Sequence, residues 1–168
     1  MDCHPCPLGH ACPFKDFSQV TICPLGTYSL GNQTSCTPCS AGYYCPSTTS
    51  STRYICPVGS YSVGAQDSCT VCEAGYACPD HTAALVVTCS SGSYSVSGSS
   101  ECTICRAGYF CPQSDASLEI PCADGTYSLA GSASCTPCPA GYMCANSNGT
   151  SIVSCNSGYY SVEGDMDC

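Results

Sequence analysis

Five Cys-x-x-Cys pairs are the residues of this 168-residue sequence whose type and spacing best suit chemistry. They run at a constant step from Cys3 and Cys6 to Cys135 and Cys138. Four thiolates from two such pairs would fill a tetrahedral zinc site. A Cys-x-x-Cys pair at a helix N-terminus can instead perform redox chemistry, because the helix lowers the thiol pKa. The third possibility is that the cysteines form structural disulfides.

The surrounding sequence favours structural disulfides. A proline-rich chain with glycosylation sequons and only three Lys and Arg is not typical of a zinc knuckle, and no window has the helical period that a redox pair would need. The 21 cysteines give the density found in small secreted domains whose cross-links replace an apolar core. We therefore expect an oxidising, extracellular location, no metal or other cofactor, and no enzymatic activity.

Other residues with chemical potential do not gather into a site. The three histidines, His4, His10 and His81, are scattered and are expected to be exposed, and Asp165 and Asp167 resemble half a calcium loop at best. The net charge of −9 excludes nucleic acid as a partner. No stretch approaches the ~20 apolar residues that cross a bilayer, so we expect no membrane span in this segment.

Every cysteine recurs at a step of 33 residues without an insertion or deletion. Such a period is typical of a tandem array, and a unit this short must share surface with its neighbours because it cannot bury a core alone. The chain opens and closes within a repeat, so we expect it to be a segment of a longer secreted protein. The repeats are residues 1–35, 36–68, 69–101, 102–134 and 135–168, the last including the first cysteine of a further repeat.

Three kinds of segment alternate between the cysteines. The first, CPLGTYSLGNQTSC from Cys23, predicts a short strand, a glycine turn and a return to the closing cysteine. The second, CSAGYYC from Cys39, predicts a tight turn. The third, between Cys45 and Cys56, is variable and predicts a loop that leads into a short strand. We expect a small disulfide-rich fold, mostly irregular with short β-hairpins and almost no helix, repeated as a linear rod or solenoid.

The string CPLGTYSLGNQTSCTPCSAGYYCP resembles the ephrin-receptor-like cysteine-rich repeat and is similar to the first half of a tumour-necrosis-factor-receptor repeat. The likeness covers essentially the whole chain. It implies an extracellular spacer, adhesin or filament component of a large protist or algal surface protein, such as a mastigoneme-type filament glycoprotein. The segment lacks the kinase, the membrane span and the double cysteine of those receptors, so the resemblance does not imply a receptor's ligand-binding role.

Spacing restricts the disulfide connectivity without fixing it. The favoured frame closes each hairpin or turn with its own cysteines, and it leaves Cys3 for an upstream partner. An interleaved frame, as in the second half of a tumour-necrosis-factor-receptor repeat, would join Cys36 with Cys45 and Cys39 with Cys56 and would leave Cys168 unpaired. The favoured pairs are Cys6–Cys12, Cys23–Cys36, Cys39–Cys45, Cys56–Cys69, Cys72–Cys78, Cys89–Cys102, Cys105–Cys111, Cys122–Cys135, Cys138–Cys144 and Cys155–Cys168.

Two sequons, at Asn32 and Asn148, fall in an expected turn and in a variable loop, where they should face solvent as glycosylation sites. The tract at residues 47–52 is rich in Ser and Thr, as mucin-like segments are. Tyrosines also recur in two phased series, which begin at Tyr28 and Tyr43. We expect them to pack over disulfides, with an exposed recognition ladder as the alternative.

Two functions from different classes fit this sequence. The first is a structural, glycan-bearing rod that associates with itself or with a companion chain to form a surface filament or matrix. Near-identity of the repeats favours it, because a receptor would diversify the modules that contact its ligand. The second is an adhesive or receptor ectodomain that binds a protein or glycan through its variable loops.

Overall fold

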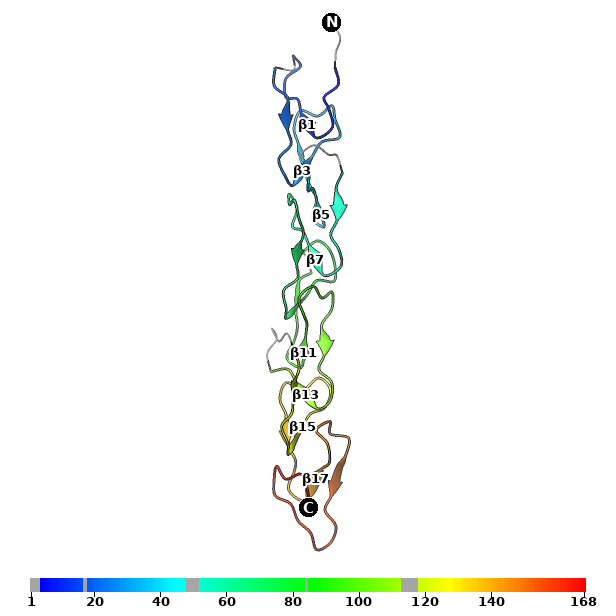
Figure 1. Ribbon diagram of the computed structural model, residues 1–168, viewed down its shortest axis with the longest axis vertical. Helices are drawn as coiled ribbons and strands as arrows, with labels where there is room; N and C mark the ends of the chain where they lie inside the picture. Colours follow the sequence, from blue (N-terminus) through cyan, green and yellow to red (C-terminus); the bar gives the residue numbers. More distant parts are fainter. Residues whose placement is uncertain (1–3, 17, 48–51, 84, 113–117) are drawn as a thin grey trace. The chain divides into compact units, whose positions relative to one another are not determined.

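The computed structural model describes residues 4–16, 18–47, 52–83, 85–112 and 118–168 (Figure 1). These residues form short strands and no helix, as expected. The strands are β1 (His10–Ala11), β2 (Thr21–Ile22), β3 (Thr27–Tyr28), β4 (Thr37–Pro38), β5 (Tyr43–Tyr44), β6 (Tyr54–Ile55), β7 (Ser60–Tyr61), β8 (Thr70–Val71), β9 (Tyr76–Ala77), β10 (Val87–Thr88), β11 (Ser93–Tyr94), β12 (Thr103–Ile104), β13 (Tyr109–Phe110), β14 (Ile120–Pro121), β15 (Thr126–Tyr127), β16 (Thr136–Pro137), β17 (Tyr142–Cys144) and β18 (Ile152–Ser154). No helix in this described part of the chain could span a bilayer.

The strands pair into antiparallel two-stranded hairpins of two kinds, which alternate along the chain. In the first kind, a Gly-Tyr turn leads into a strand that pairs with the strand just before the next cysteine. One example is β5 with β6, where Tyr43 lies opposite Ile55. In the second kind, a strand at the Gly-x-Tyr motif pairs with the residues of a Cys-x-x-Cys segment. One example is β3 with β4, where Tyr28 lies opposite Thr37.

The second kind of hairpin differs in one respect from the expectation. The first segment was expected to be a strand, a turn and a return that ends at the closing cysteine. In the structure the return strand lies beyond that cysteine, at Thr37–Pro38 between Cys36 and Cys39. The disulfide between Cys23 and Cys36 closes the loop first, and only then does the chain run back along Thr27–Tyr28.

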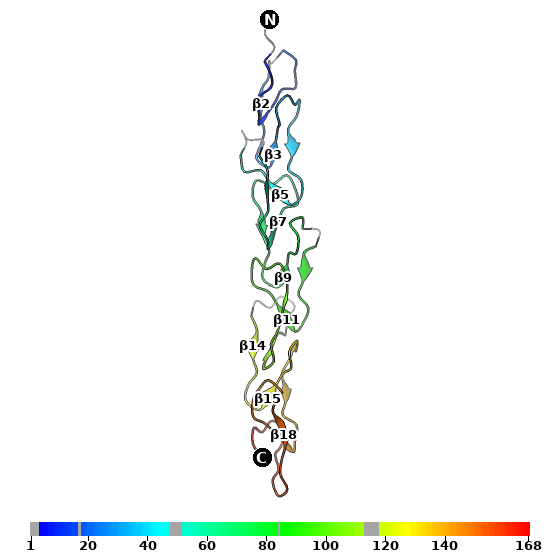
Figure 2. The same ribbon diagram turned by 90° about the vertical axis from the view of Figure 1, so that its right-hand side faces the viewer.

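The chain divides into two compact units, each a linear array of hairpins. The first unit comprises Met1–Cys72 and Cys78–Val86 and the second Glu73–Ala77 and Val87–Cys168. Within the second unit β11, β14, β15 and β18 follow one another in chain order (Figure 2). The boundaries of the 33-residue repeats fall inside hairpins of the second kind, for example between β3 and β4. The 33-residue repeats are therefore units of the sequence, and their boundaries do not separate one hairpin from the next.

Cysteines and serines form the interior. Cys23, Cys45 and Cys138 are completely buried, and so are Ser29 and Ser62. Large apolar side chains lie mostly at the surface, so their burial contributes little to stability. Cross-links and backbone hydrogen bonds must hold the array instead.

Successive hairpins approach so closely that glycine is required at the contact. Gly92 and Gly125 have positive φ angles of 85° and 75°, which side chains disfavour. A Cβ at Gly92 would collide with the backbone carbonyl of Gly131, and one at Gly125 with that of Gly164. The contact is therefore made by backbone against backbone.

Candidate functional site

The cysteines that seemed suited to chemistry are joined in ten disulfides. Their Cα–Cα distances run from 5.5 to 6.3 Å, within the usual range of about 4.4–6.8 Å. The ten pairs are those of the favoured frame, and Cys36 bonds to Cys23 rather than to Cys45. Cys3 lies outside the described residues. These disulfides indicate an oxidising environment.

The histidines and aspartates considered as metal ligands do not come together in the described part of the chain. Among the described residues, no group of three or more His, Cys, Asp or Glu side chains is placed to hold a metal ion. The carboxylate of Asp165 accepts a 2.9 Å hydrogen bond from the backbone N–H of Val162. This hydrogen bond closes a turn between Val162 and Asp165.

His81 is not the exposed residue that was expected. It is half-buried, and its buried Nδ1 has no hydrogen-bond partner within the described residues. Its backbone carbonyl accepts a 2.9 Å hydrogen bond from the N–H of Ser62. Packing between hairpins buries this histidine, which the scattered positions of the three histidines did not suggest.

A series of buried serines, which the cysteine and tyrosine patterns do not indicate, connects the two kinds of hairpin. Each follows the tyrosine of a Gly-x-Tyr motif. The Oγ of Ser128 donates a 2.7 Å hydrogen bond to the carbonyl of Tyr109, and the carbonyl of Ser128 accepts one of 3.0 Å from the N–H of Gly108. Ser95 and Ser161 donate to the carbonyls of Tyr76 and Tyr142 in the same way. The signal was present, because Ser29, Ser62, Ser95, Ser128 and Ser161 share the 33-residue period.

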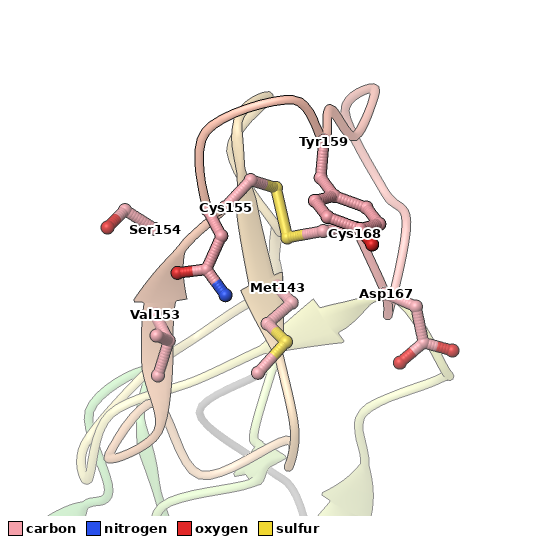
Figure 3. Close-up of a pocket in the computed structure, with 8 residues that line it drawn as sticks. Met143, Val153, Ser154, Cys155, Tyr159, Asp167 and Cys168 are labelled. Atoms are coloured by element: carbon pink, nitrogen blue, oxygen red, sulfur yellow. A yellow bond between two sulfur atoms is a disulfide. The ribbon is translucent and has the colours of Figure 1, made fainter.

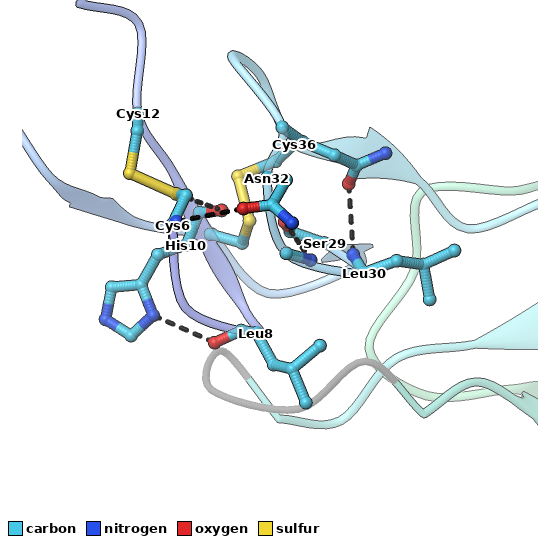
Figure 4. Close-up of a disulfide and its surroundings, with 11 residues drawn as sticks. Cys6, Leu8, His10, Cys12, Ser29, Leu30, Asn32 and Cys36 are labelled. Carbon is cyan, nitrogen blue, oxygen red and sulfur yellow. Dashed lines mark hydrogen bonds between the residues drawn. A yellow bond between two sulfur atoms is a disulfide. The ribbon is translucent and has the colours of Figure 1, made fainter. Parts of the chain in front are cut away.

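The two sequons differ in their surroundings. Asn32 is exposed at a turn, where its Oδ1 accepts a 3.2 Å hydrogen bond from the N–H of Cys6 beside the Cys6–Cys12 disulfide (Figure 4). Asn148 is half-buried, and its Oδ1 accepts hydrogen bonds from the N–H and hydroxyl of Thr150. The solvent-facing position expected for both asparagines is thus observed fully at Asn32 and only in part at Asn148. Of the Ser/Thr tract, residues 48–51 lie outside the described part of the chain.

The phased tyrosines do not behave uniformly. Most members of the two series are half-buried, so they do not form a fully exposed ladder. The half-buried members are Tyr28, Tyr43, Tyr61, Tyr76, Tyr94, Tyr109 and Tyr127. Tyr142 is exposed, and Tyr160 is 81% exposed.

The turn that follows each buried serine presents an apolar side chain to solvent. These five residues share the 33-residue period, and each is more than half exposed. We call them the turn-tip residues. They are Leu30, Val63, Val96, Leu129 and Val162. Val86, just before β10, and Val87, the first residue of β10, are exposed as well.

Two of the three Lys and Arg residues lie against tyrosine rings. The guanidinium carbon of Arg53 is 5.2 Å from the ring centre of Tyr43, and that of Arg106 is 4.3 Å from the ring centre of Tyr109. Both distances fit cation–π contacts. Arg106 also forms an ion pair with Glu119.

Hydrogen bonding perturbs one exposed carboxyl group in the first unit. The side chain and the backbone N–H of Ser18 donate to Asp16 and hold the pKa of its carboxyl below the ordinary value. The backbone hydrogen bond from Ser18 to Asp16 is 3.1 Å long.

A hollow of about 480 Å³ lies in the second unit (Figure 3). Met143 on β17 and Val153 on β18, which are register partners, line it together with Tyr159 and Asp167. A second hollow, of about 270 Å³, lies in the first unit beside the side chain of Lys15.

Comparison with protein-family models and with curated proteins gives no match for this chain, so its resemblance to known cysteine-rich repeats assigns it to no family.

Proposed function

We propose that the chain is a structural extracellular repeat module, not an enzyme, which bears glycans and assembles into a surface filament or matrix. Its partners are further copies or a companion chain. Disulfides and backbone hydrogen bonds support this proposal, because an array that does not depend on a large apolar core can be extended repeat by repeat. N-linked glycans at Asn32 and Asn148 form part of the proposal.

The observation that most favours assembly is the set of turn-tip residues. Scattered exposed apolar residues are normal. A Leu or Val that recurs at one position in five repeats, more than half exposed each time, is not scattered. In a repeat array, side chains at one repeated position are presented at equivalent places along the array, where they can together form an extended binding surface. We therefore assign the lateral contacts of the assembly to these five side chains.

Sedimentation and negative-stain microscopy of the secreted full-length protein test this assignment. We expect the unchanged protein to pellet as filaments. A variant with all five turn-tip residues changed to Ser should remain in the supernatant as isolated, folded chains.

A matched control also replaces five Leu and Val residues that are more than half exposed, at positions that are not apolar in every repeat. Its five substitutions to Ser are at Leu25, Val58, Val71, Leu85 and Leu118. This control should still form filaments. Loss of filaments in both variants, or in neither, would contradict the assignment.

A second candidate, adhesion, is favoured by one difference among the repeats. The cross-strand pair in the first kind of hairpin changes from Tyr44–Tyr54, with ring centres 5.5 Å apart, to Met143–Val153. Diversity at one surface position suits recognition of a ligand. If adhesion is the function, the native material will consist of isolated chains, and the filaments expected above will be absent.

A further inference from the structure

Both sequons lie beside turn-tip residues. In the first unit, Asn32 follows Leu30 by two residues within one turn (Figure 4). Positive φ angles of 81° at Gly31 and 54° at Asn32 make this turn tight. The side-chain carbonyl of Gln33 accepts a 3.1 Å hydrogen bond from the N–H of Leu30 and closes it. A group attached to Asn32 is therefore held next to the leucine.

The second sequon meets a turn-tip residue only through the fold. Asn148 comes long after Leu129 in the sequence, yet a Cβ at Gly149, the middle residue of the sequon, would lie 3.0 Å from Cδ2 of Leu129. The N–H of Ser128 donates a 2.9 Å hydrogen bond to the carbonyl of Ser147, which holds the sequon loop against this turn. A glycan at Asn148 is therefore attached one residue from the contact with Leu129.

These surroundings are the same in the interior of the array. Ala65, the counterpart of Asn32 one repeat later, is exposed as well, although a complete repeat precedes it. The hydrogen bond that holds the second sequon loop recurs at Ser62, whose N–H donates over 2.9 Å to the carbonyl of His81. The exposure of the first sequon and the docking of the second therefore follow from the repeat itself.

The sequons divide the five turn-tip residues into two classes. The two leucines lie beside a sequon, whereas the three valines do not, since the sequence contains only these two sequons. An N-linked glycan is bulky and solubilising, so it keeps a neighbouring apolar side chain from contact with another molecule. The larger apolar side chains are thus the ones that a glycan would cover.

We propose that N-linked glycans at Asn32 and Asn148 cover Leu30 and Leu129, and thereby limit lateral association to the three valine turn-tip residues. The inference rests on the proposed function, which supplies the glycans and the turn-tip contacts, and it adds how the assembly is regulated. A chain with fewer glycans presents more apolar turn tips and associates more strongly.

Sedimentation of the secreted full-length protein measures this regulation as a critical concentration, the concentration that stays in the supernatant at equilibrium. T34A together with T150A removes both sequons and keeps both asparagines. We expect the critical concentration to fall about tenfold, because two leucine side chains become available for burial. T34S together with T150S is the matched control. It keeps both sequons, because Ser also completes a sequon, and it should leave the critical concentration unchanged.

Leucine substitutions separate local coverage from general hydration by the glycans. In the glycosylated protein, L30S with L129S should change the critical concentration less than about twofold, because both side chains are already covered. In the variant without sequons, the same substitutions should raise it about tenfold, to the value of the glycosylated protein. If removal of the sequons strengthens association equally with and without the leucines, the proposal is overturned.

A transferred sequon tests the same mechanism in the opposite direction. A65N with D67T copies the first sequon to the turn of Val63. The backbone suits it, because φ is 53° at Ala65 and 54° at Asn32, and both Ala65 and Asp67 are exposed. A glycan there should cover Val63 and raise the critical concentration about threefold or more. A65N alone and D67T alone create no sequon and should not raise it. Unchanged assembly with the new site glycosylated would overturn the proposal.

Failure of this inference is distinguishable from failure of the proposed function. If the unchanged protein does not pellet, or the variant with five serines still does, the turn-tip assignment fails and the inference fails with it. If that assignment holds but removal of both sequons leaves the critical concentration unchanged, only the inference fails. Asparagines 32 and 148 found bare by mass spectrometry would overturn the inference and leave the sedimentation test of the turn-tip residues unaffected.

Discussion

The hydroxyl of Ser128 donates a 2.7 Å hydrogen bond to the backbone carbonyl of Tyr109, which lies 19 residues earlier in the chain. The backbone N–H of Ser128 also donates, over 2.9 Å, to the carbonyl of Ser147. A single buried serine, 2% exposed, therefore connects an earlier turn to a later one. Ser128 therefore holds neighbouring hairpins together, as a large apolar side chain does in an ordinary core.

S128A should destabilise the array locally. Removing the hydroxyl leaves the Tyr109 carbonyl without its partner, at a cost of about 1–3 kcal/mol. Native-state hydrogen exchange should show faster exchange at the amides of Gly108 and Ser128, whose hydrogen bonds join the two turns. S134A, at an exposed serine, should leave these amides unchanged. Equal protection in S128A and the unchanged protein would contradict the proposed role of the serine.

G92A should destabilise much more than G141A. Both glycines have positive φ, so both variants pay the left-handed penalty of about 1–2 kcal/mol. Only at Gly92 does the new Cβ also meet a backbone carbonyl, that of Gly131, which adds about 1–3 kcal/mol. Denaturant unfolding with disulfides intact, followed by tyrosine fluorescence, measures the difference. Equal midpoints in the two variants would show that the close approach is absent.

A65G should stabilise the first unit. Ala65 has a φ of +53°, at the position where the later repeats have Gly98, Gly131 and Gly164. Relief of the left-handed penalty, about 1–2 kcal/mol, exceeds the entropy that glycine loses on folding, about 0.5–1 kcal/mol. We expect a net gain of about 0.5–1 kcal/mol in the free energy of unfolding. A41G, at an alanine without positive φ, should be destabilising, and a loss of stability in A65G would contradict the expectation.

Glycopeptide mass spectrometry should find N-linked glycans at Asn32 and Asn148. Enzymatic release of each glycan converts its asparagine to aspartate and marks the site. Asn146 and Asn156, which lie outside sequons, should be bare and serve as controls. Finding Asn32 and Asn148 both unmodified, with no hexose on Ser or Thr, would remove the glycan-bearing part of the proposed function.

The cysteine period predicted most of the fold, because a covalent pair depends on spacing more than on the surrounding packing. The same period was present at Ser29 and Ser62, but a serine gives no indication of burial without a known partner. Strand partners were harder still, since two-residue strands such as β4 lack an alternation pattern.

Disulfide mapping tests most directly whether each hairpin is closed by its own cysteines. Pepsin digestion at acid pH prevents disulfide exchange, and cleavage after Tyr44 separates Cys39 from Cys45 in sequence. Mass spectrometry should then recover peptides that join Cys39 to Cys45 and Cys23 to Cys36, as the structure has them. Peptides that join Cys36 to Cys45 and Cys39 to Cys56 would contradict this frame and the hairpin array built on it.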